Sequence, residues 1–163
     1  MLKKGTKNIP ETTTRGNISV KDRLQSLEKT ERYAVLATDS DGQPYTSLIA
    51  YALTDDLKGL VFATPKNTSK HKNILRNPRV SVHIDNRCSS DCDYLNTESV
   101  TIIGTAHPLR KGRKRTELSA VLMKKHSKLS TFIKSSTTAL IYIDVTHYVH
   151  VSRFQSISEW HVK

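Results

Sequence analysis

The chain has 163 residues, the length of one ordinary domain and enough to bury a single core. No apolar run approaches membrane-spanning length, and the basic residues 1–4 have no apolar stretch behind them, so we expect no secretory signal and a cytoplasmic protein. The formal net charge of +11 favours a phosphate-bearing partner, either a nucleotide cofactor or a nucleic acid, and does not choose between them.

Residues 1–16 combine lysines, threonines and a proline with only two aliphatic side chains, so burial cannot offset the entropy lost on ordering them. We therefore expect a flexible N-terminal tail at 1–16 and a single domain at 17–163. Two cysteines, Cys88 and Cys92, lie in a polar loop. Because no second cysteine pair could complete a metal site, we expect free thiols and no bound metal.

The first half of the domain shows clear periodic patterns. Ser19 and Asp22 resemble a helix cap followed by an acidic residue in the first turn, which predicts a helix from about 19 to 30. The Asp41-Gly42 pair is a strong signal for a hairpin turn. Alternating or apolar segments around it predict a three-stranded antiparallel meander, with strands at 33–38, 45–53 and 60–64.

The next segment, 68–75, predicts a short helix with Ile74 and Leu75 as its inward anchors. A strand at 99–106 contains Gly104, which indicates a bulge or a close backbone approach. The remaining patterns predict a strand at 79–85, helical stripes at 118–122 and 129–133, and one or two last strands within 139–151. Hairpin-linked strands with few helical crossovers favour an antiparallel barrel over a doubly wound sheet.

The stretch most informative about function, residues 62–70, leaves a strand and opens a helix. It brings hydroxyl groups, Lys70 and free backbone N–H groups to the positive end of the helix dipole, a combination that suits a phosphate. Local chemistry alone makes Thr68 equally plausible as an ordinary N-cap.

Five short features, four sequence motifs and one strand, follow one another along the chain. They are Gly42-Gln43-Pro44-Tyr45, a following strand, Lys58-Gly59-Leu60-Val61-Phe62-Ala63-Thr64, Thr68-Ser69-Lys70 and Asn77-Pro78-Arg79-Val80-Ser81. Together they resemble the pyridoxamine 5′-phosphate oxidase-like FMN-binding split barrel family. The resemblance implies a mainly β fold, a six-stranded antiparallel split β-barrel with short flanking helices, and a homodimer with FMN at the subunit interface.

By position, the resemblance also assigns cofactor-binding residues. Those expected along the isoalloxazine ring are Ser47, Leu48, Ile49 and Ala50, followed on the neighbouring strand by Ala63 and Thr64. Those expected at the phosphate are Thr68, Ser69 and Lys70, with Lys70 as the countercharge.

The chain departs from the family oxidases at several of their functional positions. Ser47 and Ser69 stand where the oxidases have arginines, so we expect fewer charges at the phosphate, with Lys72 or Arg79 as candidates to replace them. Ala52 stands where the oxidases have a substrate-binding lysine. No Arg-x-His follows Trp160. The absence of this lysine and of the Arg-x-His argues against true pyridoxine phosphate oxidation, because the groups that hold the substrate's phosphate are missing. The substrate and any catalytic residue stay unidentified.

Three functions follow as hypotheses. The first is an FMN-dependent oxidoreductase acting on an unidentified small molecule, in which the cofactor supplies the chemistry. The second is a non-catalytic binding protein for FMN, a deazaflavin or haem. The third is a nucleic-acid binder built on the basic run 110–115, which has no interleaved aromatic residues to stack bases.

His147 and His150, three residues apart in a strand, are predicted to face opposite sides.

Overall fold

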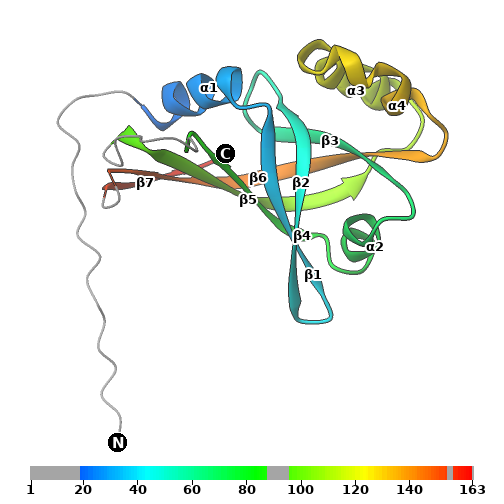
Figure 1. The fold of residues 1–163 in the computed structure, drawn as a ribbon, viewed down its shortest axis with the longest axis horizontal. Coiled ribbons are helices and arrows are strands. Elements are labelled where there is room, and N and C mark those ends of the chain that lie inside the picture. Colours follow the sequence, from blue (N-terminus) through cyan, green and yellow to red (C-terminus); the bar gives the residue numbers. More distant parts are fainter. Residues whose placement is uncertain (1–18, 88–95, 154–155, 163) are drawn as a thin grey trace, which may run out of the picture.

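A computed structural model describes residues 19–87, 96–153 and 156–162 (Figure 1). The predicted tail at 1–16 and both cysteines, Cys88 and Cys92, lie outside these ranges. Within them, no helix is both long enough and apolar enough to cross a membrane.

Among the described residues, seven antiparallel strands form one sheet in the order β3-β2-β1-β4-β5-β6-β7, and a further pairing of β3 with β6 closes six of them into a barrel. This confirms the predicted six-stranded split barrel. The seventh strand, which pairs only with β6, was not predicted. The strands are β1 (Tyr33–Ser40), β2 (Gln43–Leu53), β3 (Gly59–Pro65), β4 (Arg79–Asp85), β5 (Glu98–Pro108), β6 (Thr138–Ser152) and β7 (Ser156–His161).

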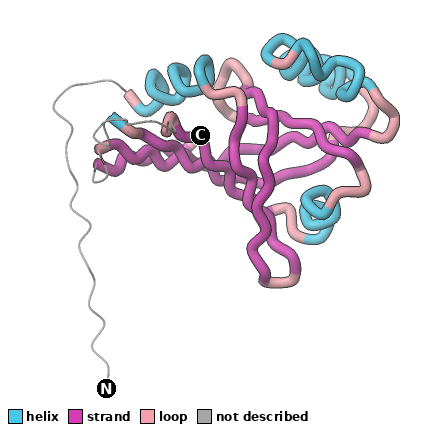
Figure 2. The backbone as a smooth tube through the Cα atoms, viewed as in Figure 1, coloured by secondary structure: helices cyan, strands magenta, loops and turns pink. Residues whose placement is uncertain are grey.

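The described helices pack on the ends and on one flank of the barrel (Figure 2). They are α1 (Val20–Thr30), α2 (Ser69–Arg76), α3 (Arg113–Lys125), the short 3₁₀ turn η2 (Ser127–Leu129) and α4 (Ser130–Lys134). The predicted cap of α1 is confirmed as a capping box, because the Ser19 hydroxyl accepts from the Asp22 N–H and the Asp22 carboxylate accepts from the Ser19 N–H.

Two hydrophobic cores lie on opposite sides of the barrel wall. The interior core is filled by alternate residues of the strands and is covered by Leu24 and Leu27 of α1. The second core lies outside β2, β3 and β6, where α3 and α4 bury Leu118, Leu122 and Ile133. The long strand β6 therefore contributes to both cores.

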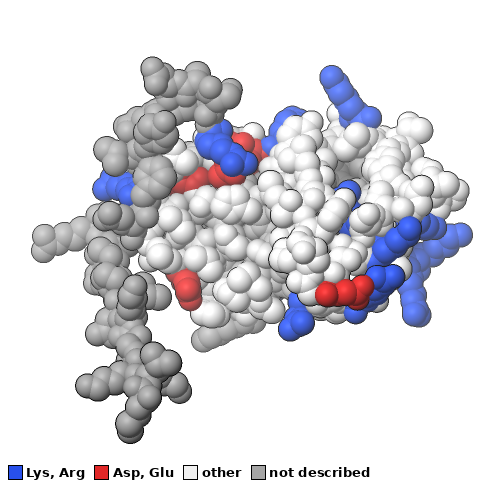
Figure 3. Space-filling view, turned by 60° about the horizontal axis from the view of Figure 1, so that its bottom comes forward, with Lys and Arg blue, Asp and Glu red and all other residues white. Residues whose placement is uncertain are grey.

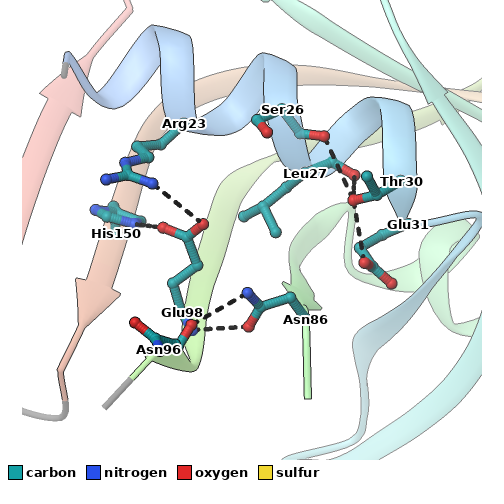
Figure 4. Close-up of polar contacts among 9 residues, drawn as sticks. All are labelled: Arg23, Ser26, Leu27, Thr30, Glu31, Asn86, Asn96, Glu98 and His150. Carbon is teal, nitrogen blue, oxygen red and sulfur yellow. Dashed lines mark hydrogen bonds and ion pairs between the residues drawn. The ribbon is translucent and has the colours of Figure 1, made fainter. Parts of the chain in front are cut away.

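A polar cluster links α1 to the start of β5 and the end of β6 (Figure 4). The Glu98 carboxylate accepts a hydrogen bond from His150 Nε2 at 2.9 Å and lies 3.8 Å from the Arg23 guanidinium. His150 is buried, whereas His147 lies on the opposite face of β6 and stacks on His161. The predicted opposite orientation of the two histidines is confirmed, and His150 is a structural residue.

Helix α2 corrects one sequence prediction. Ile74 is buried as expected, but Leu75 is 61% exposed, so it is not an inward anchor. The second anchor is Asn73, whose buried side-chain amide donates to the Thr38 hydroxyl of β1 at 3.1 Å. Asn73, which directly precedes Ile74 in the helix, also faces the core. A polar side chain is acceptable there because its buried amide group is hydrogen-bonded.

Gly104 produces the bulge that the sequence indicated, because the register of β5 against β6 shifts between Ile103 and Gly104. A Cβ atom at Gly104 would lie 2.3 Å from the backbone oxygen of Asp144. Backbone cannot move away as a flexible side chain can, so this position requires glycine.

We predict that Gly104→Ala lowers the free energy of unfolding by about 1–3 kcal/mol, because the added methyl group overpacks the β5–β6 ladder. Urea denaturation measures the change. Thr105→Ala, at the exposed neighbouring position, is the control and should cost less than about 1 kcal/mol. Equal losses in the two variants would contradict the close backbone approach.

Candidate functional site

The strands β2 and β3 separate beside the residues that were expected to bind the flavin ring. Their ladder holds only three pairs and ends at Tyr51 and Phe62. Continued in the same register, it would pair Ala50 with Ala63 and Ile49 with Thr64, but these residues are not paired across β2 and β3. The backbone groups that face the split therefore lack their usual partners in the ladder.

The neighbouring ladders continue past this split. Strand β1 pairs with β2 through all the expected ring-binding positions, from Leu36 opposite Ser47 to Tyr33 opposite Ala50. Strand β3 stays paired with β6 as far as Pro65 and Thr138. The two edges of the split are thus held rigidly, as a binding site requires.

Helix α2 begins directly after β3 without a side-chain cap. Thr68 is the N-cap residue, but its hydroxyl donates to the Pro65 carbonyl at 2.9 Å and lies 3.0 Å from the Thr64 hydroxyl. The ordinary capping role considered for Thr68 is absent. Because the first backbone N–H groups of a helix have no partner inside it, those of Ser69, Lys70 and His71 are free to bind an anion.

The charge at this end of α2 matches an anion. The first turn carries no acidic side chain. The Lys70 side chain makes no hydrogen bond or ion pair with any other residue that the structure describes, so its ammonium group has no competing protein partner. Arg79 follows the opposite end of α2, where it donates to Asn77, and an eight-residue helix is about 12 Å long. Arg79 is therefore too far from the start of α2 to replace the arginines that the oxidases have at the positions of Ser47 and Ser69.

The expected site residues differ in the direction and in the burial of their side chains. Side chains alternate along β2, so that Ser47 and Ile49 point into the barrel while Leu48 and Ala50 point outward. Thr64 is buried, and Ala63, Thr68 and Lys70 are partly exposed. Ser69 is exposed in the first turn of α2. The expected residues thus form two groups, one on the strands that border the split between β2 and β3 and one at the start of α2, which follows β3 in the chain.

A buried atom near the split is also unsatisfied. The Ser47 hydroxyl is inaccessible to solvent and has no hydrogen-bond partner among the described residues. Buried hydroxyls are nearly always paired in native proteins, so such an atom calls for an unseen partner. Together with the free backbone groups and Lys70, it shows that the residues present fit a phosphate-bearing ring ligand.

The described histidines supply no obvious proton-transfer group at the split. Burial lowers the pKa of His126, whose Nε2 atom contacts the Tyr51 carbonyl on the α3 side of β2. His71 lies in the first turn of α2, where its Nδ1 contacts the Lys66 carbonyl at 2.9 Å. The groups described at the split and at the start of α2 are therefore backbone groups, hydroxyls and the Lys70 ammonium group.

Comparison with solved structures shows the same fold in proteins with different ligands. A haem-binding protein from Mycobacterium smegmatis superposes with a TM-score of 0.72 at 17% identity, over 84% of this chain and 56% of that one. A FAD-binding protein from Mesorhizobium loti gives 0.64 at 21%, over 82% and 94%. HutZ, the haem storage protein of Vibrio cholerae, gives 0.67 at 13%, over 78% and 91%.

The chain thus spans little more than half the length of the mycobacterial protein. No curated protein matches its sequence. A family model described as pyridoxamine 5′-phosphate oxidase matches residues 20–151, which include β1 to β5, α1 to α4 and nearly all of β6. The chain therefore belongs to the pyridoxamine 5′-phosphate oxidase family.

Proposed function

We propose that this protein binds FMN in the split between β2 and β3, with the phosphate at the start of α2, and uses it as an oxidoreductase. The observation that carries the proposal is the uncapped first turn of α2 beside an interrupted β2–β3 ladder. A phosphate would accept from the free N–H groups of α2 and pair with Lys70. The Mesorhizobium loti FAD-binding protein, which has this fold, supports a flavin ligand.

The proposed oxidoreductase activity would come from the flavin, which exchanges hydride with a substrate when bound. The chain's own contribution is to hold the phosphate and orient the ring along β2. Adding reduced nicotinamide to the flavin-loaded protein without oxygen tests this part: bleaching of the flavin supports an enzyme, and an unchanged spectrum favours a binding protein.

A homodimer is the second part of the proposal, and it rests on the outer face of the sheet. Residues paired across the strands share a face, so Leu48, Val35, His83, Thr101, Val149 and Glu159 form one row from β2 to β7. The described helices pack on the other core surfaces and leave this row uncovered. Three large side chains of this outer face are Tyr33, Leu48 and Ile157, which are 59%, 67% and 47% exposed.

This face is mixed in chemistry, since it also carries His83, Thr101 and Glu159, but exposed side chains as large and apolar as Tyr33, Leu48 and Ile157 are typical of an interaction surface. A two-fold dimer would cover the same face on both subunits at once. Since Leu48 belongs both to this face and to the edge of the split, the partner would also close the flavin site.

Haem is the second candidate ligand, and the outer face gives a specific reason for it. It carries His83, and also the pair His147 and His161, whose rings stack 5.1 Å apart. Imidazole nitrogens are common axial ligands of haem iron. The visible spectrum of the purified protein separates the candidates, because haem gives a Soret band and FMN gives the two broad flavin bands.

We predict that Lys70→Ala weakens FMN binding by about ten- to hundredfold, because one charge-assisted contact to the phosphate is lost. Isothermal titration with FMN measures the change. Arg76→Ala removes the same charge from the last turn of the same helix, where Arg76 pairs with Asp41 at the surface, and should leave the affinity unchanged. Wild-type affinity in a folded Lys70→Ala variant would overturn the phosphate assignment.

We predict that Leu48→Glu yields a monomer with weakened flavin binding, because a charge on the outer face opposes burial against a second subunit. Light scattering with size exclusion measures the mass. Leu75→Glu, at a similarly exposed position on α2, is the matched control and should behave as the wild type. A wild-type protein that is monomeric when loaded with FMN would refute the dimer.

A further inference from the structure

A pocket opens on the β6 side of the β3–α2 turn, opposite the split between β2 and β3. It has a volume of about 530 Å³ and lies between this turn, the start of α3 and the connection from α4 to β6. We call it the basic pocket; its polar lining includes Lys66, His71, Lys111, Arg115, Lys134 and Thr138. None of the nine residues expected to bind FMN lines it, so the mononucleotide would leave it unfilled.

The charge of the basic pocket is uncompensated. Among the residues that the structure describes, four cationic side chains and one histidine line it, and no carboxylate does. None of the four forms an ion pair with a carboxylate in the part of the chain that the structure describes. Figure 3 shows lysine and arginine side chains gathered at this end of the molecule, where α2, α3 and α4 lie. Like charges held together repel one another, so an anion bound among them would be stabilised.

Two of these cations are fixed by the backbone. Lys66 Nζ donates to the Ser136 carbonyl at 2.7 Å, and Arg115 donates to the Leu109 carbonyl at 3.3 Å. A neutral carbonyl satisfies one donor and leaves the positive charge in place. The pocket is therefore organised before any ligand enters it, which lowers the cost of binding.

An independent observation also points to a ligand. Thr138 lines the basic pocket, is only 2% exposed, and has a hydroxyl without a hydrogen-bond partner among the described residues. A buried hydroxyl without a partner is costly unless something outside the protein supplies one. An anionic oxygen would accept its hydrogen bond.

The position of the basic pocket relates it to the proposed flavin site. Lys66 precedes the N-cap residue Thr68 by two positions, and His71 follows Lys70 directly. The pocket therefore adjoins the phosphate end of the site, away from the part of β2 expected beside the ring. An extension of the ligand beyond its first phosphate would enter it.

We propose that the basic pocket binds the second phosphate and the nucleoside of a flavin dinucleotide. The inference rests on the proposed flavin site and extends it. The cations and the Thr138 hydroxyl suit the second phosphate, while Pro108, Leu109 and Ala139 give the same pocket an apolar wall for a purine ring. The basic run 110–115 thereby gains a role in cofactor selection, since Lys111 and Arg115 both belong to it.

The test compares FAD with FMN by isothermal titration of the full-length protein. We expect FAD to bind at least about tenfold more tightly than FMN, the gain of one good charge-assisted contact. The double variant Lys111→Gln and Lys134→Gln should reduce this ratio to about one and leave FMN affinity within about twofold, because neither lysine is expected at the first phosphate. Lys58→Gln with Lys128→Gln, two exposed lysines outside the pocket, is the matched control and should keep the ratio.

Thr138→Val provides a second variant that keeps the shape of the side chain and removes the unpaired hydroxyl. It should lower FAD affinity several-fold, leave FMN affinity unchanged and not reduce the thermal midpoint. The proposal is overturned if FMN binds and FAD binds no more tightly, or if the FAD-to-FMN ratio survives the double variant. Failure of both flavins to bind would refute the proposed function itself, and the inference with it.

Discussion

The pairing of β3 with β6 is the constraint on which the rest of the structure depends. Seven residue pairs, from Gly59 opposite Asp144 to Pro65 opposite Thr138, close the barrel and separate its two cores. The same ladder sets the end of β3 beside the α4–β6 connection, where the Lys66 N–H donates to the Thr137 carbonyl. The position of α2 and of the basic pocket follows from this closure.

Because β3 is hydrogen-bonded to β6 along one edge, its other edge can separate from β2 while the strand stays fixed in the sheet. A strand that was unpaired on both edges would be exposed and mobile, whereas β3 keeps a full ladder while its β2 edge opens. The buried amide of Asn73, bonded to Thr38, holds α2 against β1 below the opening. Binding groups on β2, β3 and α2 are thus presented by rigid elements.

Most of the fold could be predicted from the sequence because strong local signals mark where its helices and strands begin and end. The Asp41-Gly42 turn and the Ser19 cap are examples, and the family motifs add the closure of the barrel. Local patterns failed where tertiary contacts decide. Leu75 is exposed because Asn73 takes the inward position, and β7 escaped prediction because its short alternating run depends on pairing with β6. The N–H groups in the first turn of α2 stay free because the Thr68 hydroxyl donates to the Pro65 carbonyl and does not cap the helix. No residue pattern shows this hydrogen bond.

Measuring the affinities of the protein for FMN and for riboflavin shows whether the start of α2 holds the phosphate of the cofactor. The two molecules share the ring and differ by the phosphate alone. We expect FMN to bind at least about a hundredfold more tightly than riboflavin, since several charge-assisted contacts reach only the phosphate. Equal affinities for the two flavins would contradict it.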